Sequence, residues 1–397
     1  MIWPPVVQMT YERYIALHLS AFISLLLAFF PAVLYAINTQ FFRRPGEGGW
    51  NRKPLPPISV LIPARNEEAS IVAAIRGVLT SRGVELELIV MDDGSTDSTA
   101  ALVLAEAEKD SRIRFESAPS LPDGWNGKQH ACWELAQKAS HEFLCFLDAD
   151  VRLGTEAIYR MASELNFTQK GRPNRALVSG FPQEQTGSFL ESLLIPLVHF
   201  ILLGYLPIAG ERLTNMSAFA VGCGQFLMVR REPYFATGGH SSIPRTMHDG
   251  LRLPRLFRKD GYRTTAYDLS KDATCRMYRG SGEVWRGLSK NATEGMAKLF
   301  RLPIFTILLF VGQILPVPIL IFSILIRDSI AFQTVFLACL FSFGMRAACA
   351  VRFRQSWLGV AFHPLGVAVL LLLQWLAFLR KLLFMKATWK GRAYRVG

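Results

Sequence analysis

The first long pattern in the chain is an apolar run at residues 15–37. A run of about 23 residues is long enough for a helix to cross the hydrocarbon core of a bilayer. The basic sequence FFRRP follows it, and basic flanks of this kind face the cytoplasm. Residues 1–40 are therefore expected to hold an N-terminal transmembrane helix, and the polar, Pro/Gly-rich residues 41–57 a linker.

Between residues 58 and 300, short apolar runs alternate with helical patterns. Strands are expected at 58–64, 86–95, 113–118 and 142–150, with helices at 67–81, 98–110 and 127–140. Because strands that are buried on both faces read as continuous apolar runs, the pattern predicts an α/β domain with a parallel sheet covered on both faces. Ligands of such sheets bind beyond the carboxyl ends of the strands.

One further apolar segment, residues 188–209, lies inside this domain. Glu191, Pro196, His199 and Pro207 interrupt it, which argues against a simple membrane span. An interfacial helix is the preferred interpretation, ahead of a buried core helix and a further span.

Residues 301–380 return to long apolar runs, at 303–326, 329–351 and 357–379. Three full crossings from a cytoplasmic domain would put the basic tail, residues 381–397, outside, against the positive-inside tendency. The first run contains three prolines, so it is interpreted as a re-entrant or interfacial element. Two crossings then return the tail to the cytoplasm. The expected protein is a multi-pass plasma or inner membrane protein with a cytoplasmic catalytic domain.

Composition supports a membrane protein with anionic ligands. Hydrophobic residues make up 51% of the 397 positions, and the net charge is +13. The basic excess suits anionic lipid or phosphate-bearing ligands. No zinc-knuckle or RNA-binding motif is present, so nucleic acid is not expected as a partner. The six cysteines form no CxxC pair, which favours free thiols in a reducing compartment.

The first two strands end in residues suited to a nucleotide. Pro63 ends one strand, and Arg65 and Asn66 follow where they could reach a ligand; Asn66 is equally an N-cap candidate. Asp93 ends the next strand, where a carboxylate can accept hydrogen bonds from a base or ribose. The competing interpretation is that Asp93 and Gly94 form only a turn.

Two further motifs suggest metal and phosphate chemistry. Asp148 and Asp150 follow the apolar strand FLCFL, and residues i and i+2 of a strand share a face. Such hard oxygen ligands suit Mg²⁺ or Mn²⁺ shared with substrate phosphates, against the alternative of a charged turn. Lys128 opens a helix after GWNG, where a phosphate group would be favourable, although a solvated lysine is an even alternative.

Downstream, Asp249 begins a basic amphipathic helix and is either a general base or only an N-cap. His248 beside it tunes the site or simply packs. Trp285 and Arg286 offer a stacking-and-phosphate pair, on a weak spacing argument.

Taken together, the segments ISVLIPARNEE, VMDDGSTDST, GWNGKQHA, FLDADV and HDG resemble glycosyltransferase family 2, in this order between residues 58 and 250. The resemblance implies the GT-A fold, a Rossmann-like mixed sheet with helices on both faces. With GWNGKQHA, the tail WKGRAY and the apolar runs, the chain looks most like membrane-bound members that glycosylate carotenoids or act with hopanoids.

The resemblance also implies an inverting transfer from a nucleotide-diphosphate sugar, with UDP preferred, and a divalent cation. Asp93 would contact the base, Asp148 the ribose or metal, and Asp150 the metal. Lys128 would lie near the diphosphate, and Asp249 would deprotonate a lipid acceptor.

Two departures from the family pattern bear on function. His248 stands where many relatives have Glu before the base, and the Q/R-x-x-R-W signature of processive synthases is absent. A single transfer to a lipid is therefore preferred. The alternatives are a polysaccharide synthase-like enzyme and an inactive nucleotide-binding scaffold. The sugar, the lipid and the oligomeric state are left open.

Overall fold

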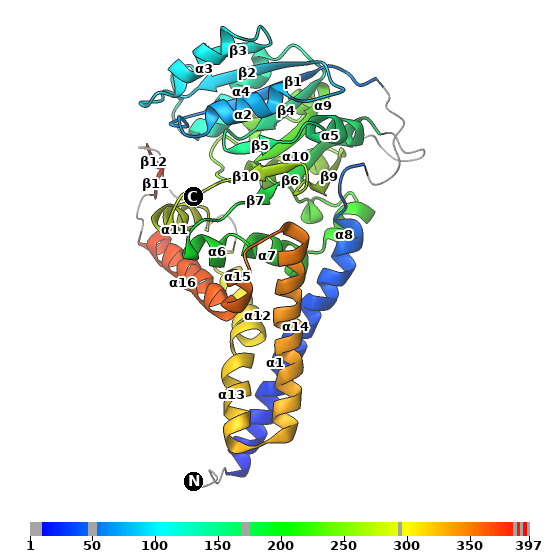
Figure 1. Ribbon diagram of the computed structural model, residues 1–397, viewed down its shortest axis with the longest axis vertical. Coiled ribbons are helices and arrows are strands. Elements are labelled where there is room, and N and C mark those ends of the chain that lie inside the picture. The colour runs from blue at the N-terminus through cyan, green and yellow to red at the C-terminus, as the bar shows by residue number, and fades with distance from the viewer. Residues whose placement is uncertain are drawn as a thin grey trace.

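The computed structural model describes residues 10–46, 54–167, 175–292, 296–383, 387–389 and 392–394. It has two parts (Figure 1). An α/β domain forms the upper part, and long apolar helices extend below it. Short helices from the middle of the sequence lie at the junction between the two.

A seven-stranded mixed sheet organises the α/β domain, in the order β3-β2-β1-β4-β8-β6-β9. Its strands are β1 (Ile58–Ala64), β2 (Leu86–Asp92), β3 (Ile113–Ser117), β4 (Phe143–Leu147), β6 (Arg175–Phe181), β8 (Phe226–Arg230) and β9 (Arg263–Asp268). The first four strands are parallel, as the apolar pattern predicts. Strand β8 runs antiparallel to both β4 and β6, so the sheet is mixed.

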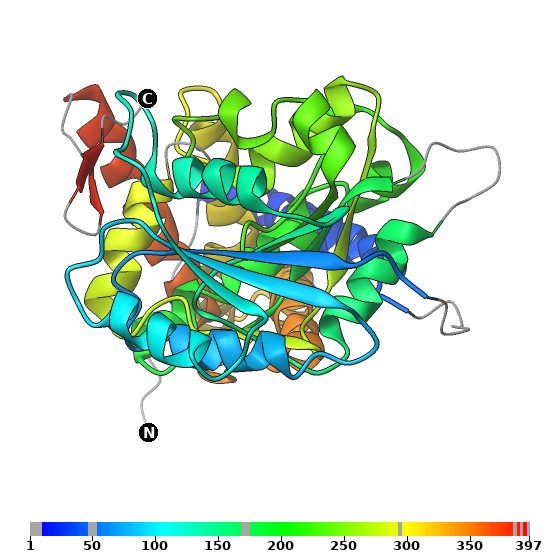
Figure 2. The ribbon, with the colours of Figure 1, turned by 90° about the horizontal axis from the view of Figure 1, so that it is seen from above.

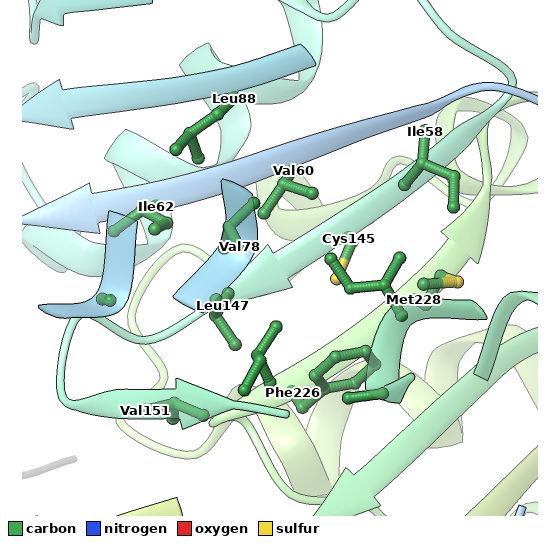
Figure 3. Packing of buried hydrophobic residues seen from close by; sticks show 14 of the residues in the cluster. Ile58, Val60, Ile62, Val78, Leu88, Cys145, Leu147, Val151, Phe226 and Met228 are labelled. Carbon is green, nitrogen blue, oxygen red and sulfur yellow. The ribbon is translucent and has the colours of Figure 1, made fainter. Parts of the chain in front are cut away.

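Helices cover both faces of this sheet. One face packs against α2 (Ile71–Leu79), α3 (Thr99–Ala107) and α5 (Ala157–Asn166). The other packs against α4 (Gly127–Lys138), α9 (Arg231–Ala236) and α10 (Asp249–Lys259). Figure 3 shows the first core, in which Val60, Cys145 and Met228 from three neighbouring strands lie side by side. Burial of continuous apolar strands on both faces fixes the sheet as the rigid centre of the domain.

A second, three-stranded sheet lies close to the carboxyl end of β4. It consists of β5 (Val151–Leu153), β10 (Ala273–Cys275) and β7 (Gln183–Glu184), with β10 in the middle. Seen from above, the carboxyl ends of β1 and β2 point toward the side of the domain where α11 (Ser281–Asn291) lies (Figure 2). The small sheet therefore brings segments more than a hundred positions apart to the edge where ligands of such sheets bind.

The apolar segment expected at 188–209 forms three short helices, α6 (Phe189–Leu194), α7 (Leu197–Tyr205) and α8 (Ile208–Leu213). Pro196 and Pro207 stand at the N-caps of α7 and α8, where a proline ends the preceding helix. Most of its side chains are buried, because α7 packs on α1 and α14 while α6 packs on α11 and α16. The side-chain amide of Asn38 on α1 links this helix to the end of α7 by donating to the carbonyls of Leu203 and Leu206.

Three of the helices in the described residues are long and apolar enough to cross a membrane: α1 (Tyr11–Phe41), α14 (Ser329–Phe353) and α16 (His363–Leu382). Helix α12 (Arg301–Leu309) continues through a π-helical turn (Phe310–Ile314) into α13 (Pro316–Ile326), and the two parts meet at 40°. A re-entrant element would have to reverse direction, whereas this broken helix runs on along α1 (Figure 1). Its far end lies at the start of α1, where His18 Nε2 is 2.9 Å from Asp328 Oδ2.

Helix α16 has a different position from the other long helices. It follows the short α15 (Leu358–Ala361) and packs mainly against α6, α11 and the π-helical turn, beside the bundle of α1, α12–α13 and α14 (Figure 1). Beyond it, the two short strands β11 (Ala387–Trp389) and β12 (Arg392–Tyr394) lie beside α11, on the side of the α/β domain.

Candidate functional site

The loops after β1 and β2 are joined into one surface at the carboxyl edge of the sheet. Arg65 donates hydrogen bonds to the carbonyls of Asp93 and Gly94, the latter at 3.1 Å. Asn66 has a left-handed backbone (φ 51°), and its side-chain oxygen accepts from the Thr96 N–H at 2.8 Å. Asn66 therefore braces the second loop instead of capping the helix that follows it.

Asp93 lies within this joined surface. It is only 6% exposed, and its backbone N–H donates to the carbonyl of Ala64, the last residue of β1. The cap of α3 comes from another residue: Asp97 accepts from the Thr99 N–H at 3.0 Å. The turn interpretation also contains this Asp97 cap. The side chain of Asp92 takes part in the turn, because the Ser95 N–H donates to its Oδ2 at 3.1 Å.

The two carboxylates after β4 stand at the centre of the same edge. Asp148 follows the strand directly, and its N–H donates to the carbonyl of Gln225, which precedes β8. Asp150 stands immediately before β5, so that the short turn between the two strands carries both side chains. The sequence pattern predicts a strand through residue 150, but β4 ends at Leu147, so both aspartates lie in the turn that follows the strand.

Lys128 joins this pair to the distant Asp249. Asn126 caps α4 by accepting from the Lys128 N–H at 3.0 Å, so the lysine stands in the first turn of the helix. Its ammonium lies 2.7 Å from Asp148 Oδ1, 3.0 Å from Asp249 Oδ2 and 3.3 Å from the carbonyl oxygen of Gly224. An ammonium has three N–H donors, so these three acceptors use all of them.

Asp249 is the first residue of α10 and is buried against a glycine loop. Its Oδ1 accepts from the Gly250 N–H at 2.8 Å. A Cβ atom on Gly224 would lie 2.0 Å from Asp249 Oδ1, and one on Gly250 would lie 2.4 Å from the Gly224 nitrogen. The two glycines therefore let the loop before β8 approach the carboxylate closely enough for Lys128 to reach it.

The charges in this cluster shift one another's protonation. Burial raises the pKa of Asp148, the Lys128 charge opposes this rise, and the charges of Asp150 and Asp249 add to it. Burial would also raise the pKa of Asp249, but the charge of Lys128, the neighbouring His240 and the hydrogen bonds from Lys128 and the Gly250 N–H together lower it. Asp249 is therefore ionised at neutral pH, while the crowded carboxylates favour an added positive charge.

The residues present fit a divalent cation in an open site. Among the described residues, no three His, Cys, Asp or Glu side chains gather in a way that could hold a metal ion. Asp148 and Asp150 supply two hard oxygen ligands and repel each other. This donor set matches Mg²⁺ or Mn²⁺, which keep further positions for phosphate oxygens and water, and does not match a closed zinc cage.

Three residues that the sequence analysis names as candidates make no contact described here with the cluster of Lys128, Asp148 and Asp249. Trp285 packs against the apolar cluster of α6, α7 and α16, and Arg286 is exposed on α11. Neither lines the cavity that lies beside Asp150. His248 is half-buried and its carbonyl accepts from the N–H groups of Leu251 and Arg252 at the start of α10.

The sequence pattern missed four residues that lie beside Asp150: Arg152, Gln185, Arg276 and Arg279 line a cavity there. It also missed Glu184, a buried carboxylate whose pKa burial raises to about 8. Only Arg152 could have been found from the local sequence. It stands two residues after Asp150, and residues at this spacing lie on the same side of an extended chain. Glu184 lies on β7, Gln185 follows it, and Arg276 and Arg279 follow β10. Strand β10 pairs with both β5 and β7, and these pairings are not local.

The close approach of Gly224 makes a specific prediction. Gly224→Ala is expected to displace the Asp249 carboxylate and to slow any reaction in which this carboxylate accepts a proton by roughly a hundredfold, the size of a lost proton-transfer group. Cation binding should persist, because Asp148 and Asp150 belong to the turn after β4. Gly344→Ala on α14 is the matched control, because nothing lies within 4 Å of its Cβ position. Equal activity of the two variants would contradict the role of this approach.

The fold and the site together define a class: a mixed α/β sheet with carboxylates and a lysine at its carboxyl edge, joined to long apolar helices. Residues 59–193 match the family model of glycosyl transferase family 2. The mannosyltransferase PcManGT from Pyrobaculum calidifontis, solved in complex with GDP-Man and Mn²⁺, superposes with a TM-score of 0.55 at 16% identity. The alignment covers 91% of this chain and 99% of that one. This likeness shows the fold, a GT-A-like sheet with flanking helices.

Among curated proteins, the chain is 28% identical over 242 residues to the 4,4'-diaponeurosporenoate glycosyltransferase of Staphylococcus aureus. The match covers 60% of this chain and 61% of that protein, which is less than two thirds of its length. Residues 59–193 are thus similar to glycosyl transferase family 2, and about 60% of the chain is distantly similar to this carotenoid glycosyltransferase.

Proposed function

We propose that this protein is a membrane-bound inverting glycosyltransferase that moves a sugar from a nucleotide-diphosphate sugar to a lipid acceptor. The observation that carries the proposal is the convergence of Asp148, Asp249 and Lys128 at the carboxyl edge of a family 2 domain. These residues come from three separate elements, and no requirement of the fold explains why three charged groups should share one point there.

In this proposal the donor lies along the carboxyl edge of the sheet. Its base lies against the joined loops of Arg65, Asn66 and Asp93, and its ribose lies near Asp148. Asp148 and Asp150 would hold a divalent cation shared with the diphosphate, whose charge would stabilise the departing nucleoside diphosphate. UDP is the preferred nucleotide, as the sequence resemblance implies.

Transfer then needs one nucleophile and one proton acceptor. An acceptor oxygen forms the new bond to the anomeric carbon on the face opposite the diphosphate, and the bond to the diphosphate oxygen breaks with its electron pair. This geometry inverts the anomeric carbon. Asp249 takes the proton of an acceptor hydroxyl; its lowered pKa leaves it ionised before the acceptor arrives.

Lys128 supports this step by its position. It holds the Asp249 carboxylate in one orientation and balances the charges of Asp148 and Asp249 while the site is empty of substrate. Binding of a diphosphate and a cation changes that balance, because new charges arrive beside Asp148. The lysine is then a counter-charge that can follow the growing negative charge on the leaving group.

The lipid nature of the acceptor is supported by the apolar helices joined to the domain. The curated relative is named for a carotenoid acid, a membrane-soluble molecule. In this proposal α1, the broken helix α12–α13, and α14 cross the bilayer, and α16 lies obliquely beside the α/β domain. The acceptor approaches from the membrane side of the site.

The distribution of basic residues supports a cytoplasmic catalytic domain. Near the domain, the ends of the long helices carry Arg43, Arg44, Arg301, Arg352, Arg354, Arg380 and Lys381. The opposite end carries Arg13 and Arg327, balanced by Glu12 and Asp328. The positive-inside tendency therefore puts the domain in the cytoplasm of a plasma or inner membrane. With α16 beside the domain, three crossings leave the basic tail on this same side, which removes the conflict in the sequence pattern.

The proposal is tested by nucleotide binding to the full chain purified in detergent. UDP, GDP and CMP and their sugars are titrated with Mn²⁺, with Mg²⁺ and with a chelator. We expect one nucleotide family to bind with either cation, and the chelator to weaken that binding at least tenfold, as loss of a shared metal would. Binding unaffected by the chelator would contradict the metal role of Asp148 and Asp150.

The same preparation separates the competing functions. Transfer of one sugar to a membrane lipid extract supports the proposed enzyme, whereas a growing polymer would indicate a polysaccharide synthase. Nucleotide binding with no transfer to any lipid fraction would favour an inactive scaffold. If no nucleotide binds under any condition, the proposed function is wrong.

A further inference from the structure

A cavity of about 400 Å³ lies beside Asp150, at the edge of the proposed donor site. Its lining is polar: Asp150, Arg152, Gln185, Arg276 and Arg279. Three guanidinium groups thus face a single carboxylate of the cavity wall. A cavity with this composition is suited to a ligand that carries more than one negative charge.

The three-stranded sheet β5-β10-β7 holds this lining in place. Arg152 stands on β5, Gln185 follows β7, and Arg276 follows β10. The Arg276 N–H donates to the carbonyl of Asp150 at 3.4 Å, and the Gln185 N–H donates to the carbonyl of Cys275 at 2.8 Å. The cavity wall is therefore tied directly to the backbone of the proposed metal ligand.

One of the three arginines is neutralised by the protein itself. Arg276 Nη2 lies 3.2 Å from Glu191 Oε2, and Glu191 is almost fully buried. The N–H groups of Gly187 and Gly280 also donate to this carboxylate, at 2.7 and 2.8 Å. The ion pair with Glu191 thus fixes the orientation of the Arg276 side chain in the cavity wall. Because Glu191 neutralises it, Arg276 adds little net charge to the cavity.

The other two arginines lack an ion pair of this kind. Arg152 donates to the carbonyls of Ala149 and Val151, and Arg279 donates to the carbonyl of Ala69. Within the part of the chain that the structure describes, neither forms an ion pair with an acidic side chain. The charges of Asp150 and Glu67 act on Arg152. Because neither arginine is held in an ion pair, each guanidinium can offer a planar pair of N–H donors to phosphate oxygens, which favours an anionic ligand.

The sequence resemblance assigns the diphosphate to Lys128, yet the Lys128 ammonium already donates to two carboxylates and a carbonyl. The cavity arginines lie beside Asp150, which in the proposed function would hold the cation shared with the diphosphate. We infer that Arg152 and Arg279, directed by Arg276, bind the diphosphate of the donor and stabilise it as the leaving group. This inference rests on the proposed function and names the residues that hold that part of the substrate.

The chemistry needs no additional reactant. When the bond between the anomeric carbon and the diphosphate oxygen breaks, its electron pair stays on that oxygen, and the guanidinium N–H groups stabilise the added charge. The acceptor oxygen forms the new bond, and its proton goes to Asp249. No proton has to reach the diphosphate, because it leaves as an anion beside the arginines.

The test compares Arg279→Gln and Arg152→Gln with the wild type, in the full chain with Mn²⁺. Arg279 is exposed, so its replacement is expected to leave folding intact; thermal unfolding of each variant checks this. We expect the dissociation constant for the nucleoside diphosphate to rise roughly tenfold to a hundredfold, the range for a hydrogen bond between charged groups. Binding of the nucleoside alone should be unchanged. Arg82→Gln, at an exposed position between α2 and β2, is the matched control.

The outcomes separate this inference from the proposed function. If the wild type binds the nucleoside diphosphate and both variants bind it equally well, the diphosphate assignment is wrong while the proposed function stands. If only the KM for an anionic lipid acceptor rises, the cavity binds the acceptor, and the inference is again overturned. If the wild type binds no nucleotide, the proposed function itself fails.

Discussion

Asp249→Asn is expected to lower sugar transfer by about 10²-fold to 10⁴-fold, the usual contribution of a general base. The substitution keeps the size of the side chain and one of the two oxygens, which can accept either from Lys128 or from the Gly250 N–H. It removes the group that accepts the proton. Because Asp249 comes from α10 and not from the turn after β4, binding of the nucleotide with Mn²⁺ should remain within about threefold of the wild type.

The measurement is a pair of assays on the same preparation, nucleotide binding and transfer to lipid. Asp260→Asn, at the opposite end of the same helix, is the control and should retain activity. Loss of nucleotide binding in Asp249→Asn would show that the carboxylate belongs to the donor site. Full activity would remove it from the mechanism.

Asp150→Asn is expected to abolish the cation dependence of nucleotide binding. A metal ligand replaced by an amide loses its charge, so affinity should fall at least about tenfold to a hundredfold, to the level of the wild type with chelator. The remaining binding should be the same with Mn²⁺, with Mg²⁺ and without either. Transfer should fall with it, because the leaving group loses its counter-charge.

Isothermal titration with and without chelator measures this directly. Asp110→Asn is the control: Asp110 pairs with Arg112 before β3, at the edge of the sheet opposite the site. A variant that still needs the cation as much as the wild type does would refute the metal role of Asp150. Asp148 would then have to hold the cation with substrate oxygens alone.

The sequence predicted well those features that depend on neighbouring residues. The apolar runs at β1, β2 and β4 are strands because a chain buried on both faces must be apolar throughout. The helix at Gly127 begins where Asn126 can cap it, and Asp249 begins its helix as expected. The placement of aspartates at strand ends follows from the same local rules.

The helix boundaries show where local rules compete. The pattern predicts a helix from residue 67, but α2 begins at Ile71. The N–H groups of Glu67 and Glu68 donate instead to the side chains of Thr99, the first residue of α3, and Asp97, in the loop between β2 and α3. Contacts between two loops outweigh the helical preference of the glutamates, and they build the nucleotide surface of the proposed site.

The sequence also left undecided how the apolar helices are arranged relative to one another. Length and hydropathy identify the apolar segments, but they do not say which of them lie together. Packing decides this: α13 runs to the start of α1, where His18 meets Asp328, while α16 packs against the domain helices. The prolines that suggested a re-entrant element produce only a 40° bend, because the π-helical turn carries the chain past them.

The sequence by itself determined the first four strands of the large sheet and the helices between them, apart from their exact ends, because each depends on residues a few positions apart. Only the tertiary structure decided which charges meet. Lys128 reaches Asp249 because Gly224 and Gly250 let the loop before β8 approach the start of α10. The arginine cavity exists because β10 pairs with both β5 and β7. Such contacts join segments far apart in the chain, and their geometry is set by the packing of the whole domain.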